Sequence, residues 1–365
     1  MAISSVLITG GAGFVGSHVA SELLCRGYRV RVLDVVAPQV QLAREIELHV
    51  GDVRDAAAVD RALAGVDAVF HLAAAASDGR SMQDVERCTS VNNVGTAVLA
   101  ERMVGRRIQR LVLASSKSVY GEGLFADGAG EAHEGKSRLF ADLRRGEWEV
   151  LARDGTRLLP RPTPESKSVA LESIDALCKY DQERLCLLAG RAHGIPTVVL
   201  RIFNAYGPRQ ALGDGRTTGA LPAMASRILE GKPPQLFEDG AQLRDFVDVR
   251  DVARAFHLAL VRDEAAGLVF NIGSGVPRSI REVAERVAAL LGQPHLHPEI
   301  TGTYRAGDVR HCYADISLAR RVLGYEPAVD LDEGLAEWLR GPIARGAAPP
   351  HAEPREPSAA LELTL

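Results

Sequence analysis

A glycine-rich turn near the start of the chain constrains the fold more strongly than any other sequence feature. A short apolar run, Val6 to Ile8, is typical of a buried strand, and it leads directly into Gly10-Gly11-Ala12-Gly13. Residues 14–24 then resume with helical spacing. A strand, a glycine turn and a helix in this order form the context that a dinucleotide-binding fingerprint requires. The sequence therefore predicts a dinucleotide site at this turn.

The glycines of the turn have separate physical roles in such a site. Gly10 permits the tight turn, Gly13 lets the backbone approach a pyrophosphate, and Gly16 lets the helix pack close to the strand. The helix that begins with Phe14 and Val15 presents unpaired N–H groups and the positive end of its dipole. We expect these groups to bind the phosphates of the dinucleotide.

A carboxylate at the end of the second predicted strand selects between two nicotinamide dinucleotides. Residues 28–33 form this strand, and Asp34 closes it about twenty residues beyond the glycines. Such a carboxylate accepts hydrogen bonds from the ribose hydroxyls of NAD and would repel the 2′-phosphate of NADP. An exposed aspartate without a ligand is the alternative. The sequence predicts NAD.

Composition excludes several classes of protein. The 365-residue chain has a net charge of −4, and its basic residues form neither a run nor a stacking platform for nucleic acid. No apolar stretch approaches the length of a membrane span, and the first strand begins so early that no signal peptide is expected. The five cysteines lack metal-ligand spacing. We expect a cytoplasmic protein with reduced thiols and no metal site.

Further apolar segments alternate with helical ones along the first half of the chain. Strands are expected at 46–50, 66–72, 110–114 and 197–203, and the intervening helices include a long one at 82–104 and another at 173–192. Alternation of this kind implies a parallel sheet with right-handed crossovers. The predicted fold class is therefore α/β, with a Rossmann-type doubly wound parallel sheet and a smaller mixed α/β substrate domain.

Changes in composition suggest the domain boundaries. Residues 1–203 form the predicted NAD-binding domain, interrupted by a Gly-, Arg- and Pro-rich insertion at about 122–172. This insertion could be a surface excursion or a lid over the substrate. Residues 204–341 form most of the substrate domain, with some segments returning to the first domain. Residues 342–365 are rich in proline and alanine and are expected to be disordered.

Residues after the third and fourth strands add to the expected cofactor site. Asp52, which precedes Val53, could hydrogen-bond an adenine amino group, or it could cap the helix at 56–63. The small residues that follow Leu72, beginning with Ala73 and Ala74, would let the backbone lie against a cofactor.

Taken together, these motifs resemble the extended short-chain dehydrogenase/reductase family, specifically its nucleotide-sugar epimerases and dehydratases. The similarity is greatest to the 4-epimerases of UDP- and dTDP-hexoses. It extends from Ser5 to about Leu339, apart from the insertion. The motifs that carry it are Thr9 to Gly16, Asp34, Gly51 to Val53, His71 to Ala74, Asn92 to Thr96, Ser115 to Gly121, Arg201 to Arg209, Arg244 to Val249 and Gly307 to Arg310.

The resemblance implies an active site formed by a serine and a Tyr-x-x-x-Lys pair. Ser116 takes the position of the residue that binds the sugar hydroxyl. For the pair, one register places Asp175 four residues before Lys179, so that the tyrosine is replaced. The other keeps Tyr180 but has Arg184 in place of the lysine. One step along a helix rotates a side chain by about 100°. We favour Asp175 and Lys179.

Replacement of tyrosine by aspartate leaves the acid–base group open. Asp175 is shorter than tyrosine, and we expect Lys179 and cationic NAD⁺ to lower its pKa, which would make it a poor base. It could instead form an i,i+4 ion pair with Lys179. A bridging water, Lys117, Tyr180 or a residue of the insertion could then carry the proton.

The resemblance also implies the chemistry and the substrate. Family dehydratases have Asp-Glu directly after the serine, whereas this chain has Lys117-Ser118. We therefore expect C4 epimerisation of a UDP- or dTDP-linked hexose through a transient keto sugar, with a GDP-sugar as a further candidate. The alternatives are a dehydratase or oxidoreductase, and a non-catalytic protein that binds NAD or a nucleotide sugar.

The same resemblance assigns the substrate diphosphate to three residues. These are Asn204, Arg244 and Arg310, and Arg305 competes with Arg310 for the role. Arginine suits it because its planar guanidinium binds phosphate oxygens with two donors at once. The family further implies a homodimer.

Overall fold

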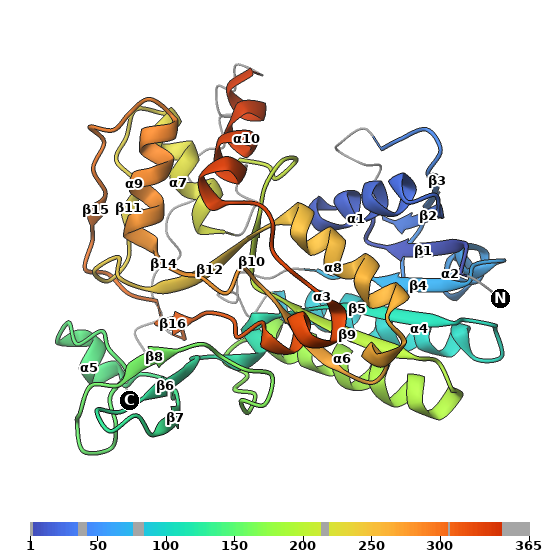
Figure 1. Cartoon of the computed structure of the whole chain (residues 1–365), viewed down its shortest axis with the longest axis horizontal. Coiled ribbons are helices and arrows are strands. Elements are labelled where there is room, and N and C mark those ends of the chain that lie inside the picture. The colour runs from blue at the N-terminus through green and yellow to red at the C-terminus, as the bar shows by residue number, and fades with distance from the viewer. Residues whose placement is uncertain (1–2, 36–41, 76–83, 213–218, 306, 345–365) are drawn as a thin grey trace.

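The larger of two lobes is built on a parallel sheet (Figure 1). The computed structural model describes residues 3–35, 42–75, 84–212, 219–305 and 307–344. Seven strands pair in the order β13-β9-β5-β4-β1-β2-β3, all parallel. Their bounds are β1 (Ser5–Thr9), β2 (Arg29–Asp34), β3 (Glu47–Val50), β4 (Ala68–His71), β5 (Arg110–Ser116), β9 (Thr197–Ile202) and β13 (Val269–Ile272). The predicted Rossmann-type sheet is confirmed.

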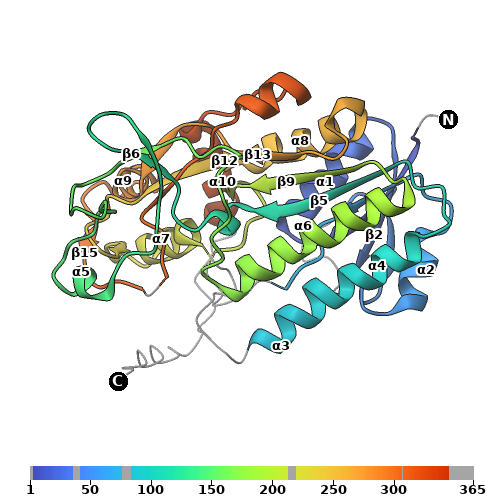
Figure 2. The same cartoon turned by 90° about the horizontal axis from the view of Figure 1, so that it is seen from below.

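Alternate residues of each central strand face two different helix layers. In β1, Val6 and Ile8 pack into one buried cluster with α1 and α8, whereas Leu7 packs into another with α2 and α4. A strand buried on both faces is apolar throughout, which explains the continuous apolar run. Figure 2 shows α4 and α6 side by side over the sheet. The helices of this lobe are α1 (Phe14–Cys25), α2 (Ala56–Leu63), α3 (Val85–Cys88), α4 (Gly95–Met103), α6 (Ile174–His193) and α8 (Val249–Val261).

The smaller lobe has its own apolar core. Trp338 and Tyr206 are buried there among aliphatic side chains of α7, α9 and α10. One small sheet contains β10, β12, β14 and β16, and a second pairs β11 with β15. The bounds are β10 (Asn204–Tyr206), α7 (Ala220–Leu229), β11 (Gln235–Leu236), β12 (Leu243–Asp248), β14 (Pro277–Ser279), α9 (Ile280–Leu290), β15 (Glu299–Ile300), β16 (His311–Cys312) and α10 (Leu331–Ala344).

The insertion is a folded unit that packs against the smaller lobe. Its strands pair antiparallel in the order β7-β6-β8. Backbone hydrogen bonds connect it to the smaller lobe, from Gly123 N to His311 O (2.8 Å) and from Thr163 N to Tyr313 O (2.8 Å). Its elements are β6 (Leu124–Ala126), β7 (Ala132–Glu134), α5 (Phe140–Arg144) and β8 (Leu159–Arg161).

Three segments differ from the sequence-based expectation. The edge strand β13 was not predicted, because its four residues lie in a short apolar stretch beside glycines. The expected helix at 82–104 consists of α3, a π-helical turn at Thr89–Val94 and α4, and residues 82–83 lie outside the described ranges. Helix α10 continues to Ala344, past the expected start of the tail at 342, and residues 345–365 lie outside the described ranges.

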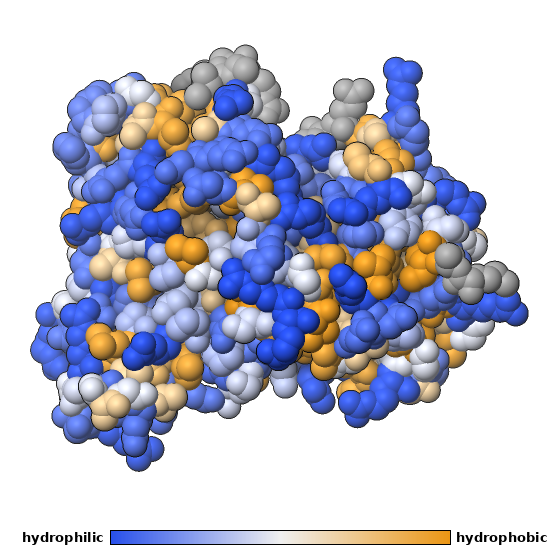
Figure 3. All heavy atoms as spheres, viewed as in Figure 1, coloured by the Kyte–Doolittle hydropathy of each residue, from blue (hydrophilic) through white to orange (hydrophobic). Residues whose placement is uncertain are grey.

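The surface is that of a polar globule on the face drawn in Figure 3. Hydrophilic side chains cover most of this face, with apolar residues interspersed among them. Among the described residues, no helix combines the length and apolar character needed to cross a membrane.

Candidate active site

The glycine turn has the geometry of a cradle for a phosphate group. Gly10 has a positive φ of 72°, and a Cβ atom there would lie 2.7 Å from the backbone nitrogen of Ala73. A Cβ at Gly16 would collide with the carbonyl oxygen of Gly10. Gly13 precedes the first turn of α1, whose N–H groups at Phe14 and Val15 begin the helix. At Gly10 and Gly16 the absence of a side chain thus lets the turn pack against β4 and α1, whereas at Gly13 an added Cβ would meet only the Gly10 carbonyl at 3.4 Å. This is the division of roles that a dinucleotide-binding turn requires.

A substitution at Gly16 should therefore remove cofactor binding. In Gly16→Ala the new methyl group overlaps the Gly10 carbonyl, and the turn has to shift. Overpacking of this kind costs about 1–3 kcal/mol, so we expect at least a tenfold rise in the Kd for NAD, measured by calorimetry. Gly128→Ala is the matched control, because nothing lies within 4 Å of its added methyl. Equal NAD affinity in both variants would contradict the assignment.

Asp34 and Asp52 occupy different environments at the ends of their strands. Asp34 ends β2, and its Oδ2 accepts a hydrogen bond from Ala12 N (3.0 Å), which places the carboxylate beside the glycine turn. Asp52 pairs instead with Arg54, at 2.6 Å between Oδ2 and Nη2, and this partner lowers its pKa. The cap of α2 is Asp55, which accepts from Ala57 N, so the capping role considered for Asp52 is wrong.

The segment after β4 is held in place by the side chain of Asn92. Leu72 and Ala73 are half-buried and Ala74 is exposed, whereas Val53 is buried in the core. Fully buried Asn92 accepts from Ala75 N (2.7 Å) and donates to Ala75 O (3.1 Å). This amide therefore fixes the backbone that follows β4, and in this structure its role is structural.

Helix α6 presents Lys179 and Tyr180 to different surroundings. Lys179 Nζ donates to the carbonyl of Ala114 in β5 (3.4 Å), at the carboxyl end of the sheet. Tyr180 and Arg184 line a separate hollow of about 380 Å³ together with Lys167. Of the two registers, the one with Lys179 therefore faces the end of the sheet where the glycine turn lies.

Asp175 lies near Ser118 without forming an ion pair. Ser118 Oγ donates to Asp175 Oδ2 at 3.5 Å, and among the described residues no ion pair joins Asp175 to Lys179. Burial raises the pKa of Asp175, and the positive charge of Lys179 lowers it only in part. The expectation of a lowered pKa is thus wrong for the protein without ligand, since desolvation outweighs the neighbouring ammonium. An ionised carboxylate of raised pKa is a stronger base.

Ser116 shares a short turn with Ser118. It ends β5, and its Oγ accepts a hydrogen bond from Ser118 N (3.1 Å) at the start of the 3₁₀ turn Lys117–Tyr120. The structure thus gathers Ser116, Ser118, Asp175 and Lys179 at the carboxyl end of β5. Sequence reasoning had not assigned a role to Ser118, because nothing in its local pattern shows that α6 approaches it.

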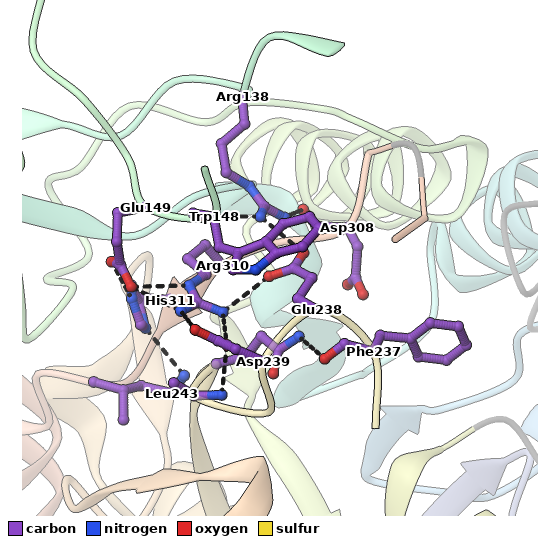
Figure 4. Close-up of polar contacts among 12 residues, drawn as sticks. Arg138, Trp148, Glu149, Phe237, Glu238, Asp239, Leu243, Asp308, Arg310 and His311 are labelled. Carbon is purple, nitrogen blue, oxygen red and sulfur yellow. Dashed lines mark hydrogen bonds and ion pairs between the residues drawn. The ribbon is translucent and has the colours of Figure 1, made fainter. Parts of the chain in front are cut away.

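Arg310 lies inside a buried cluster of charges (Figure 4). Its side chain is 0% exposed and forms ion pairs with Glu149 (2.7 Å), Glu238 (2.9 Å) and Asp239 (2.7 Å). A guanidinium surrounded by three carboxylates cannot also bind a substrate diphosphate unless the cluster opens. The assignment of Arg310 to the diphosphate is therefore corrected. The cluster had no signal in the sequence, because its members are far apart along the chain.

The other predicted substrate residues are less deeply buried than Arg310. Arg244 donates to the carbonyls of Val309 (2.5 Å) and Arg310 (2.9 Å), so it supports the loop that precedes β16. Arg305 lies over the ring of Phe237, with 3.9 Å between guanidinium carbon and ring centroid. The side-chain oxygen of Asn204 is buried without a hydrogen-bond partner in the described structure, a state that a ligand donor would relieve.

Comparisons with known proteins agree with this geometry. Residues 6–137 and 160–273 match the NAD dependent epimerase/dehydratase family, and the unmatched stretch between them falls within the insertion. The chain is 35% identical to a dTDP-L-rhamnose 4-epimerase of Burkholderia thailandensis, over 93% of this chain and 96% of that protein.

Solved structures show the same similarity over nearly the whole chain. The UDP-glucose 4-epimerase of Thermotoga maritima with UDP-glucose has a TM-score of 0.78 at 29% identity, covering 94% of this chain and 100% of that one. The UDP-glucose 4-epimerase of Thermus thermophilus in complex with NAD has a TM-score of 0.72 at 30% identity, covering 92% and 98%. With its glycine cradle at the switch point of a seven-stranded parallel sheet, the chain belongs to the family of NAD-dependent epimerases and dehydratases.

Proposed function

We propose that the protein is an NAD-dependent nucleotide-sugar epimerase that inverts C4 of a UDP- or dTDP-linked hexose through a transient keto sugar. One observation carries the proposal: on α6, Lys179 donates to the carbonyl of Ala114 in β5 (3.4 Å), and Asp175, one turn earlier, accepts from Ser118 (3.5 Å), two residues after Ser116. When bound, NAD supplies the acceptor and donor of hydride. The relatives and structural neighbours named as 4-epimerases support this choice.

Each site residue would bind a different part of the coenzyme or of the nucleotide sugar. Lys179 would bind the nicotinamide ribose, and Ser116 would bind the hydroxyl of the sugar at the reacting carbon. Asp34, beside the glycine turn, would accept hydrogen bonds from the adenine-side ribose. Asn204 and Arg305 at the lobe junction would bind the diphosphate, with Arg305 in the place first given to Arg310.

Three other functions are distinguishable from this one. A 4,6-dehydratase would form a 4-keto-6-deoxy sugar, but Lys117 and Ser118 follow Ser116 instead of an acidic pair. A protein that binds the nucleotide sugar without turnover would leave every substrate unchanged. A simple oxidoreductase would produce a net change in NADH absorbance.

The experiment is a screen of purified protein against UDP-, dTDP- and GDP-hexoses. The coenzyme is first released by denaturation and identified, and epimer formation is then followed by NMR with substrates deuterated at C4. We expect bound NAD, an epimeric product and retention of deuterium at C4. Loss of that deuterium to solvent, or a dehydrated product, would refute C4 epimerisation.

We also propose that the protein is a homodimer of the cytoplasm. Leu177 and Leu188 are exposed on α6, and their separation of eleven residues places them within about 20° of the same face. Val94, at the end of the segment between α3 and α4, is also exposed. All five cysteines are free thiols, which suits a reducing compartment. Light scattering should show twice the chain mass of 39.1 kDa, and a monomer at micromolar concentration would contradict the dimer.

A further inference from the structure

We propose that Ser118 contacts the substrate hydroxyl and relays its proton to Asp175, so that the two side chains together replace the missing tyrosine. The inference rests on the proposed epimerase function and assigns a role to a residue outside the expected serine and Tyr-x-x-x-Lys positions. It also explains how the short carboxylate of Asp175 can accept the proton of a sugar hydroxyl that the longer tyrosine side chain would reach directly.

Ser118 and Asp175 lie within hydrogen-bond distance of each other. Ser118 Oγ lies 3.5 Å from Asp175 Oδ2, which is a long hydrogen bond. Catalytic hydrogen bonds are often long in the absence of substrate and shorten when it binds. The neighbouring Ser116 is fixed relative to Ser118 by its bond to Ser118 N (3.1 Å), so both hydroxyls belong to one rigid turn after β5. A sugar hydroxyl bound by Ser116 therefore lies within reach of Ser118.

The surroundings of Asp175 allow its carboxylate to change protonation state. Asp175 is partly buried, and among the described residues it accepts a hydrogen bond from Ser118 but forms no ion pair that would fix it in the charged form. Lys179 lies one turn away and donates to the carbonyl of Ala114. A carboxylate in this environment can gain and lose a proton, whereas one locked in an ion pair would resist protonation.

Tyr180 and Lys117, which could also carry the proton, have no contact with Asp175 among the hydrogen bonds of the described residues. Tyr180 lines the separate hollow beside Arg184 and is turned away from Asp175. Burial lowers the pKa of Lys117, and the charge of Arg244 in the smaller lobe lowers it further. Ser118, by contrast, has a hydroxyl that donates a hydrogen bond to Asp175.

The proton step balances in both directions. As C4 is oxidised, the proton of its hydroxyl would move to Ser118 Oγ, the original Ser118 proton would move to Asp175 Oδ2, and the C–O bond would become a carbonyl. Bound NAD would supply the acceptor and donor of hydride, and both protons would move back when the keto sugar is reduced on its opposite face. The protein ends each cycle in its initial protonation state.

The test is a double-mutant cycle on the NAD-loaded protein. Ser118→Ala and Asp175→Asn should each lower kcat by about 10²-fold, the lower end of the range for positioned acid–base groups. The KM for the nucleotide sugar and the Kd for NAD should stay within about twofold, because the relay acts in the transition state and contributes little to binding of either ligand. The double variant should be no slower than Asp175→Asn. Ser118→Thr should restore activity, and exposed Ser166→Ala is the matched control.

A second background makes the test specific. In Asp175→Tyr the phenol reaches the sugar hydroxyl directly, so adding Ser118→Ala should change kcat by less than about threefold. Three results would each overturn the relay. The double variant could lose kcat by the product of the two single losses, Ser118→Ala could keep full activity, or Ser118→Ala could lower kcat as much in the Asp175→Tyr background as in the wild type.

A readout without turnover separates this proposal from the proposed function. Asp175 can be titrated by ¹³C NMR of labelled aspartate, assigned with Asp175→Asn. Since the Ser118 hydroxyl and Lys179 are the groups that favour its ionised form, Ser118→Ala should raise its pKa. An unchanged pKa would overturn the contact even if every sugar tested were inert. An inert wild type with the expected pKa rise would refute epimerisation alone.

Discussion

Replacement of Arg310 by methionine should lower the free energy of unfolding by about 3–5 kcal/mol, the usual cost of removing one partner of a buried ion pair. Arg310 is 0% exposed and its guanidinium contacts Glu149, Glu238 and Asp239. Without it, the carboxylate of Glu238 keeps only Arg138 (2.8 Å) as an ion-pair partner in the described structure. Methionine fills much of the volume, but the carboxylates of Glu149 and Glu238 stay buried and repel each other without the guanidinium between them.

The loss should be concentrated where the insertion meets the smaller lobe. Glu149 belongs to the insertion, Glu238 and Asp239 precede β12, and Arg310 connects them. We therefore expect Arg310→Met to expose the insertion to limited proteolysis before the large lobe unfolds. Urea denaturation followed by tryptophan fluorescence measures the global loss, because Trp148 of the insertion and Trp338 of the smaller lobe report on both.

Acid should act on the same cluster. Burial opposes ionisation of Glu149, but hydrogen bonds from His311 and Arg310 lower its pKa to about 2. Because this pKa is below the ordinary value of about 4.3, the stability that Glu149 contributes is present above pH 4.3. It is lost as the pH falls toward 2. In Arg310→Met this part of the acid dependence should shrink, since one of the groups that favour the carboxylate is gone.

A surface partner of the same carboxylate provides the control. Arg157 also pairs with Glu149 (2.9 Å), but its side chain is 64% exposed. Exposed ion pairs contribute about 0–1 kcal/mol, so Arg157→Met should change the stability by less than 1 kcal/mol. Similar losses of unfolding free energy in Arg310→Met and Arg157→Met would show that the contribution of the cluster to stability does not depend on the burial of Arg310.

The case of Arg310 shows which parts of the site the sequence could predict. The glycine turn and Asp34 are read correctly in position because strand, turn and helix follow one another within a few tens of residues. Arg310 stands in a motif beside Gly307, and a motif does not reveal that carboxylates from residues 149, 238 and 239 will surround it. The partners of a buried charge depend on tertiary packing, which local pattern does not encode.

The catalytic helix shows the same limit on a smaller scale. The helix expected at 173–192 agrees with α6 to within one residue at each end, and the structure shows that Ser173 is its N-cap. The choice between Lys179 and Tyr180 depends on which side of α6 meets β5, and only the packing shows this. The pKa of Asp175 was mispredicted because desolvation, which raises it, depends on burial that its neighbours in sequence do not determine.

Replacement of Lys179 by methionine should abolish most turnover while the fold survives. Lys179 is the ammonium at the carboxyl end of β5, and loss of a single positioned donor typically costs about 10²–10³-fold in kcat. Burial already lowers the pKa of Lys179, which means that the charged form is held there against a desolvation penalty. Methionine of similar volume removes that penalty, so the melting temperature should stay equal or rise. Activity should fall and NAD affinity weaken without any loss of folded protein.

The neighbouring register supplies the matched comparison. Tyr180→Phe and Arg184→Met alter the side chains that line the separate hollow, so kcat should stay within about twofold of wild type if they lie away from the reacting groups. Lys179→Met should also raise the pKa of Asp175, because the positive charge that lowers it is gone. The order of activities decides between the registers: a loss in Arg184→Met with activity kept in Lys179→Met would place the opposite face of α6 against the coenzyme, and the roles given to Asp175 and Ser118 would fall with it.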